Sequence, residues 1–129
     1  MEQLSNTAGF LSAILFITAN AYYPAKLIAR HVIGWDKEMT IFFSKYLKLH
    51  ISSNLLAFFF LLIHAHYAEE KTALLGLSFV VTFLLTIEGV LMHYKVFPED
   101  NKYIRMLHTQ QALFWIWIGL IIIGHMKVI

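Results

Sequence analysis

The sequence predicts an all-α membrane protein, a bundle of four transmembrane helices, and three observations support this prediction. Apolar residues make up 59% of the 129-residue chain and charged residues 14%, whereas an average soluble domain has about half and about a quarter. A soluble domain of this size cannot bury so much apolar surface, because its surface is large relative to its volume. Four segments with little or no charge each approach the roughly 20 residues that cross a hydrocarbon core. We therefore expect a single four-helix transmembrane domain, residues 1–129.

The first helix is expected over residues 6–25, which carry no charge. It is not a cleaved signal peptide, since the chain lacks a basic start and the apolar part is too long. Tyr22 and Tyr23 are expected at the membrane interface, and Pro24 is expected to end the helix. Residues 26–46 mix basic side chains with Leu, Ile, Trp and Phe, which predicts a partly helical amphipathic segment on the cytoplasmic membrane surface.

Three further helices follow. The second is expected over residues 46–67 and the third over residues 72–94, so a very short loop makes them a tight antiparallel pair. The third helix contains one acidic residue, Glu88. The fourth is expected over residues 107–127, after a polar loop that contains a proline.

The distribution of basic residues predicts the orientation of the helices. Eight Lys and Arg residues lie around the two longer loops, and only Lys71 and Lys127 lie on the opposite side. This positive-inside bias predicts an integral multi-pass protein of a prokaryotic cytoplasmic membrane, with both termini outside. The net charge of +2 then reflects topology, and we see no nucleic-acid signal in it.

The chain has no cysteine. This excludes disulfides, thiolate metal sites, iron–sulfur clusters and covalent attachment of haem through a C-x-x-C-H motif. Any haem in this protein would be held by coordination alone.

Two of the seven histidines, His50 and His64, lie near opposite ends of the second helix. Their separation corresponds to about 21 Å along a helix, and fourteen steps of about 100° bring both to one face. That face also carries Asn54, Ala57 and Leu61, and the small Ala57 leaves room near the middle. One histidine near each membrane surface suits two stacked haems, because each iron needs an axial imidazole and each porphyrin a slot between helices.

This His-x13-His spacing on the second of four helices resembles the membrane cytochromes b. That group includes the quinone-linked cytochrome b subunits of respiratory dehydrogenases and the small cytochromes of the b561 type. The resemblance implies haem b, with two haems expected and one as the alternative. It also implies that the fourth helix supplies the opposite ligands, which pairs His50 with His108 and His64 with His125.

The fourth helix departs from the ideal pattern. His108 and His125 are about 25 Å apart and their directions differ by roughly 100° on a straight helix. Their use as two ligands requires either a bend at the glycines of this helix or a His108 that precedes the regular helix. His93, at the end of the third helix, is the alternative to His108. His66 is expected at the surface, near a haem propionate, and is a further alternative.

Other polar residues have weaker functional interpretations. Lys48, Lys95 and Arg105 are candidate propionate contacts, and their alternative role is only to set topology. Glu88 is an intramembrane carboxylate, and with Gln111 it is a candidate for a quinone site that exchanges protons.

The resemblance implies a b-type di-haem electron carrier between a quinone pool and a partner redox subunit. That partner would be a cytochrome c, an iron–sulfur protein or a dehydrogenase. Because the chain has no nucleotide, flavin or substrate motif, we expect an electron-transfer subunit of an oxidoreductase complex rather than a complete enzyme. The alternatives are a mono-haem membrane anchor subunit and a haem-free protein whose histidines conduct protons or bind a transition metal.

Overall fold

The computed structural model describes residues 1–128, and this part of the chain is helical with no strand. Ile129, the last residue of the predicted domain, lies outside the described residues. Three helices are long and apolar enough to cross a membrane, or four if a bent pair is counted as one span. The chain divides into two compact units, Met1–Tyr67 and Ala68–Ile129.

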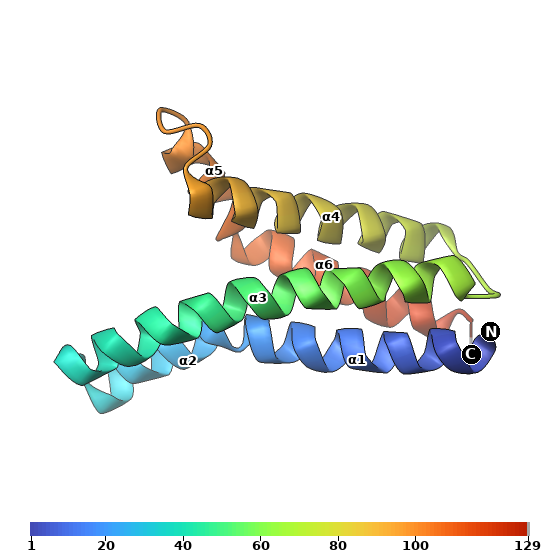
Figure 1. Ribbon diagram of the computed structural model, residues 1–129, viewed down its shortest axis with the longest axis horizontal. Helices are drawn as coiled ribbons and strands as arrows, with labels where there is room; N and C mark the ends of the chain where they lie inside the picture. Colours follow the sequence, from blue (N-terminus) through green and yellow to red (C-terminus); the bar gives the residue numbers. More distant parts are fainter. Residues whose placement is uncertain (129) are drawn as a thin grey trace. The chain divides into compact units, whose positions relative to one another are not determined.

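The first unit is a long antiparallel helical hairpin (Figure 1). One arm contains α1 (Glu2–Asn20), α2 (Tyr22–Ile28) and the π-helical turn η1 (Ala29–Ile33). The other arm is α3 (Lys37–Tyr67). A short turn joins them, in which Gly34 has a φ of 104° that favours glycine. The side chain of Asp36 then accepts a hydrogen bond from the Met39 N–H at 2.7 Å at the start of α3.

Pro24 interrupts the first arm without ending it. It lies in the first turn of α2, where a missing N–H is tolerated, although it cannot bond the carbonyl of Asn20. Near the break, the Tyr46 hydroxyl of α3 donates to the carbonyl of Thr18 at 2.9 Å. The helical arm Glu2–Ile33 continues beyond the predicted end at residue 25. Residues 26–46 are divided between the two arms and their turn, instead of forming a segment of their own.

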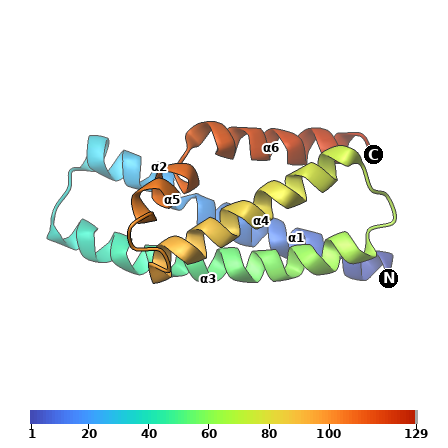
Figure 2. The ribbon, with the colours of Figure 1, turned by 90° about the horizontal axis from the view of Figure 1, so that it is seen from above.

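The second unit contains α4 (Ala73–Tyr94), α5 (Asn101–His108) and α6 (Gln111–Met126), and Figure 2 shows the bend between the last two. This bend is 45°. The bend arises at residues 109–110. The Thr109 hydroxyl donates to the carbonyl of Arg105 at 2.8 Å, and the backbone of Gln110 is extended. The predicted fourth helix is thus interrupted before residue 111, and His108 precedes the regular part of it.

Both ends of α4 are capped. At the N-terminus the Thr72 side chain accepts from the Leu75 N–H at 3.2 Å. At the C-terminus Lys95 adopts the left-handed conformation, with φ 50°. The Val96 N–H then bonds the carbonyl of Leu91, as in a Schellman motif. This cap ends α4 at Tyr94, where the sequence predicted its end.

A hydrogen bond and a close contact help to join α4 to α6. Trp117 of α6 donates its indole N–H to the Thr82 hydroxyl of α4 at 2.7 Å. Gly124 of α6 lies against Leu75, so close that an added Cβ would be 2.8 Å from the leucine Cδ2. Small or hydroxyl-bearing residues at such contacts let helix backbones approach each other.

Burial in both units is the reverse of the usual pattern in soluble proteins. Many large apolar side chains are exposed, and the buried positions are mostly small. Examples of the small buried residues are Ser5, Ala8, Ser12, Ala19, Ser53, Ala57, Ser78 and Thr82. Such a distribution is typical of helices whose outer faces contact lipid, where close packing replaces hydrophobic burial.

Candidate functional site

Helices α1 and α3 meet through three contact pairs that recur every seven residues. Along α1 these pairs are Ser5–His64, Ser12–Ala57 and Ala19–His50. Seven residues are about two helical turns, so the three positions form one seam on each helix. The seam carries both histidines of the His-x13-His pair, and the structure confirms that they share one face of α3.

His50 lies at the α2 end of this seam. Its Nδ1 is 2.7 Å from the carbonyl of Ala19. The Asn54 amide nitrogen is 3.4 Å from both ring nitrogens, and it donates to the carbonyl of His50 at 3.0 Å. The Tyr22 ring is tilted against the imidazole, with centroids 5.5 Å apart. Neighbours on three sides therefore fix the orientation of this half-buried ring.

His64 lies at the opposite end of the seam. Its Nδ1 is 2.9 Å from the carbonyl of Ser5 and 3.1 Å from the Ser5 hydroxyl, which itself donates to the carbonyl of His64. The ring rests against Gly9, where an added Cβ would lie 2.8 Å from Nδ1 and 3.0 Å from Cε1. The position of this imidazole thus depends on the absence of a side chain at residue 9.

These contacts select one tautomer of both imidazoles. A backbone carbonyl only accepts hydrogen bonds, so a bond to it places the ring proton on Nδ1. The lone pair is then on Nε2, across the ring. Histidine ligands of metals commonly have this arrangement, in which a carbonyl orients the ring through one nitrogen and the other nitrogen binds. By donor chemistry, His50 and His64 therefore fit the axial ligands of a haem.

The role of Ala57 differs from the predicted one. The sequence suggested that this small residue leaves room between the two histidines. In the structure that space is filled by α1, because Ala57 is fully buried and its carbonyl accepts a hydrogen bond from Ser12 at 2.9 Å. Ala57 thus serves close approach of the two helices of this unit.

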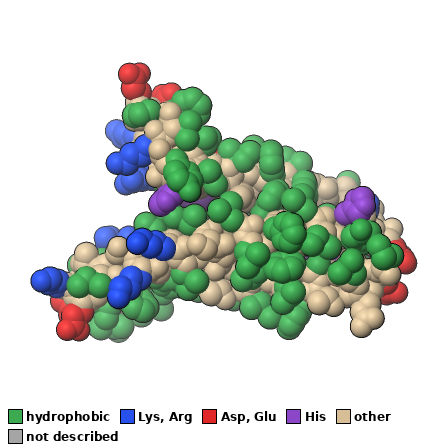
Figure 3. Space-filling model, viewed as in Figure 1, with side chains coloured by type: hydrophobic (Ala, Val, Ile, Leu, Met, Phe, Trp, Pro, Cys, Tyr) green, Lys and Arg blue, Asp and Glu red, His purple; other side chains and the backbone are tan. Residues whose placement is uncertain are grey.

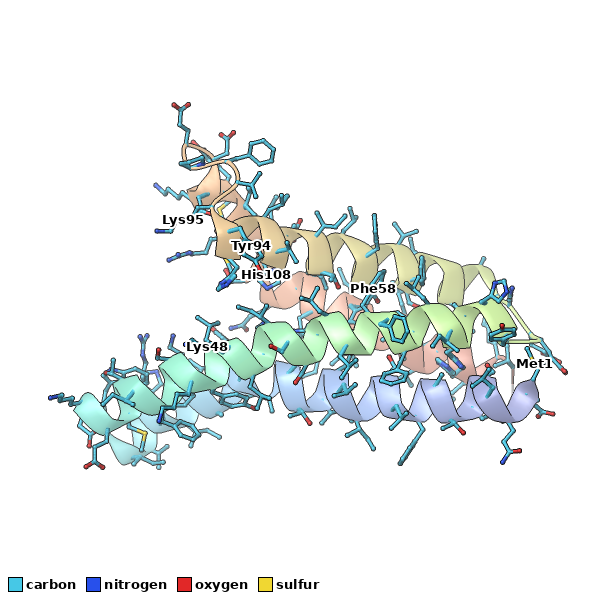
Figure 4. All side chains as sticks on the ribbon, in the orientation of Figure 1. Met1, Lys48, Phe58, Tyr94, Lys95 and His108 are labelled. Atoms are coloured by element: carbon cyan, nitrogen blue, oxygen red, sulfur yellow. The ribbon has the colours of Figure 1, made fainter. Side chains whose placement is uncertain are left out.

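In the second unit, His108 ends α5 and packs against α4. An added Cβ on Gly89 of α4 would lie 3.0 Å from the His108 Cε1, so this imidazole also rests on a glycine. Figure 4 shows His108 near the end of α4 that carries Tyr94 and Lys95. Both units thus hold one candidate ligand against a helical glycine.

The remaining candidate histidines are exposed. His125 is on α6, and its Nδ1 is 2.8 Å from the carbonyl of Ile121 one turn earlier, which selects the same tautomer. His93 continues the α4 face of Gly89, and its ring packs edge-on against Tyr94. His66 packs in the same way against its neighbour Tyr67.

The charged candidates lie at different places along their helices: Lys48 is inside α3, Lys95 is the C-cap of α4, and Arg105 is in the last turn of α5. Lys48, Lys95 and Arg105 are exposed, and Figure 3 shows Lys and Arg gathered over one end of each unit. Glu88 is half-buried on α4, and its Oε2 has no hydrogen-bond partner among the described residues. Gln111 is the exposed first residue of α6.

Sequence reasoning missed the residues that hold the histidines. Ser5, Gly9 and Ala19 on α1, and Gly89 on α4, all contact a candidate ligand. The available signal was the spacing of small residues on the first helix, where Ser5, Ser12 and Ala19 recur every seven positions. Such spacing predicts a close helix contact.

No group of three or more His, Cys, Asp or Glu side chains that could hold a metal ion occurs among residues 1–128. Comparisons of the chain with protein-family models, curated proteins and solved structures found no match.

Proposed function

We propose that the protein is a b-type di-haem electron carrier that passes electrons across a bilayer between a quinone pool and a partner redox subunit. One observation carries this proposal: the Nδ1 atoms of His50 and His64 each contact a backbone carbonyl of α1, at 2.7 and 2.9 Å. Two histidines on one helix face thus have the same tautomer and each bonds a backbone carbonyl, an arrangement common among histidines that bind metals.

The chain's own residues hold, orient and separate the proposed ligands. α1 fixes both rings and is itself fixed by the Ser12 bond to Ala57. The two histidines are about 21 Å apart along α3, a separation that would suit one haem near each surface of a membrane. Haem held by two imidazoles supplies reversible one-electron chemistry with no open position on the iron. The apolar surroundings and the ligand hydrogen bonds tune that chemistry.

The opposite ligands are proposed from the second unit. His108 and His125 are the first choice, with His93 and His66 as alternatives. His108 is supported by its contact with Gly89, which holds the ring in place. Lys48, Lys95 and Arg105 are proposed propionate contacts. Glu88 and Gln111 are proposed for quinone binding and proton exchange.

The chain would then be the membrane subunit of a prokaryotic respiratory oxidoreductase, with its redox partner on another polypeptide. The partner would supply or remove electrons at one membrane face, and the quinone would accept or supply them at the other face. The three or four helices that are long and apolar enough to cross a membrane support a multi-pass location.

One observation favours the mono-haem anchor as the second candidate. The proposed ligands of the second unit are unequal, since His108 is half-buried against Gly89 of a neighbouring helix whereas His125 is exposed. In that case a single haem would be held at the His108 end.

Haem stoichiometry tests the proposal and separates it from its rivals. The purified protein should give a low-spin b-type reduced-minus-oxidised spectrum and about two haems per chain in a pyridine haemochrome assay. His50→Ala and His64→Ala should each remove about one haem. His31→Ala, at an exposed position of η1, is the matched control and should remove none. One haem in the unmodified protein would favour the anchor, and a folded protein without haem would refute the proposal.

A further inference from the structure

Two cations converge on one indole ring at the turn of the first unit's hairpin. The Arg30 Cζ lies 4.9 Å from the centroid of Trp35, and the Lys26 Nζ lies 6.0 Å from the same centroid. Lys26 is also 5.4 Å from the Tyr22 ring, and it donates to the Tyr22 hydroxyl at 3.3 Å. Cation–π contacts with Trp and Tyr thus hold two flexible basic side chains beside each other.

Within the described part of the chain, neither Lys26 nor Arg30 forms an ion pair with Asp or Glu. Two positive charges held at one ring repel each other, and an anion between them would convert that repulsion into attraction. Arg and Lys are also the side chains best suited to bind phosphate oxygens, Arg through its planar fork and Lys as a compact charge.

If the uncharged part of the first arm crosses the hydrocarbon core, the cluster lies at the depth of the headgroup layer. Residues 3–25 carry no charge and suffice to cross the hydrocarbon core. At about 1.5 Å per residue, Lys26 and Arg30 then lie roughly 5 and 10 Å beyond Tyr23 along the helix. A headgroup layer of about 5–8 Å on each side of the core reaches both side chains, because long basic side chains can extend along it.

The surface around the cluster favours lipid over a water-soluble anion. Val32 and Ile33, in the same helical turn as Arg30, are 77% and 66% exposed. Basic side chains beside exposed apolar ones suit an amphipathic ligand, which has an anionic head and acyl chains. Basic clusters next to a transmembrane helix attract anionic lipids in the same way.

We propose that Lys26, Arg30 and Trp35 form a binding site for the phosphate headgroup of an anionic phospholipid. The two cations bind the phosphate, and Trp35 holds them in place at the interface. The positive-inside prediction assigns this site to the cytoplasmic leaflet. The site does not depend on haem binding, so it can be tested even if the proposed electron-transfer function is wrong.

Native mass spectrometry of the full chain in detergent tests this site. Equal amounts of phosphatidylglycerol and phosphatidylcholine are added, and the adducts that remain bound are counted. We expect a roughly thirtyfold preference for phosphatidylglycerol, on the scale expected for two basic side chains acting on one lipid. The combined Lys26→Gln and Arg30→Gln variant should lose this preference. The matched control, Lys71→Gln with Lys127→Gln, removes the same charge elsewhere and should keep it.

Two further variants and one soluble ligand keep the result decisive. Arg30→Lys combined with Lys26→Arg retains both charges and should retain the preference. Trp35→Leu should weaken the preference, because it removes the indole ring that the two cations contact. Circular dichroism confirms that each variant is folded. Equal binding of both lipids, or a preference that survives the double glutamine variant, would overturn the site. Glycerophosphoglycerol that binds as tightly as the lipid would also overturn it, because the ligand would then be a soluble anion.

Discussion

Replacing Gly9 by alanine tests directly whether α1 holds the imidazole of His64. The new Cβ would lie 2.8 Å from the His64 Nδ1, whereas ordinary contacts begin at 3.4 Å. The ring must therefore move by about 0.6 Å. If it moves away from α1, the Nδ1 to Ser5 carbonyl distance of 2.9 Å increases to about 3.5 Å, the limit of a hydrogen bond.

Two opposing terms set the expected change in the free energy of unfolding. Overpacking of a close contact costs about 1–3 kcal/mol. Alanine is a better helix former than glycine by about 1 kcal/mol, which offsets part of that cost. The net loss for Gly9→Ala is then roughly 0–2 kcal/mol, because the two terms have opposite signs.

Gly76→Ala is the matched control. Gly76 is also in a helix long and apolar enough to cross a membrane, but a Cβ there meets no described atom within 4 Å. This variant should gain about 1 kcal/mol from helix propensity alone. The two alanine variants should thus differ by about 1–3 kcal/mol in reversible unfolding with sodium dodecyl sulfate, followed by circular dichroism.

Haem binding gives a second readout that a purely structural effect would not change. Under the proposed function, Gly9→Ala should lower the occupancy or shift the midpoint potential of one haem, the one at the His64 end, and leave the other unchanged. The reasoning would be refuted if Gly9→Ala were as stable as Gly76→Ala and gave the spectrum and haem content of the unmodified protein.

Further substitutions test the packing and the helix cap of the second unit. Trp117→Phe should lower the free energy of unfolding by about 1 kcal/mol, because it removes the 2.7 Å bond to Thr82. Thr82→Val should have a similar effect. The double variant should lose little more than either single variant, because both changes remove the same bond. Lys95→Gly should raise the stability by about 1 kcal/mol, because φ is 50° at this position, and a lower melting temperature would contradict this account. Gly124→Ala should lower the stability by about 1–3 kcal/mol through its clash with Leu75, and Leu75→Ala in the same chain should recover part of the loss.

The helical architecture could be predicted from the sequence because it follows from solvent and length. A chain with so little charge can satisfy its backbone in lipid only through helices or a closed barrel, and segments of this length favour helices. The ends predicted at residues 67 and 94 agree with those of α3 and α4, since charged or capping residues follow directly.

The ends near Pro24 and His108 could not be predicted in the same way. Pro24 removes the hydrogen bond to the Asn20 carbonyl, but it lies in the first turn of α2, where a helix can start again, and α3 packs against both α1 and α2. Near His108 the interruption depends on the Thr109 hydroxyl, which bonds the backbone of the preceding turn. Both effects are decided by local partners that hydrophobic periodicity does not reveal.

For the candidate site, the sequence predicted the shared face of His50 and His64 but not what that face contacts. Helical periodicity relates residues within one helix, whereas the pairing with Ser5 and Ala19 depends on the register between two helices. α1 is apolar over most of its surface, so its pattern does not reveal which side faces α3. Only its evenly spaced small residues indicate the side.

Because the seam repeats every seven residues in both helices, the spacing of the contact residues along α1 must match their spacing along α3. One residue inserted between Ser5 and Ala19 would turn everything beyond it by about 100° and advance it by about 1.5 Å. One histidine would keep its hydrogen bond to a carbonyl of α1, and the other histidine would lose its bond. An insertion of seven residues in α1 would restore the direction but leave the two carbonyls too far apart for the unchanged histidines. Change in the length of either helix is therefore tolerated only outside the seam, toward the hairpin turn or the chain end, or in both helices together.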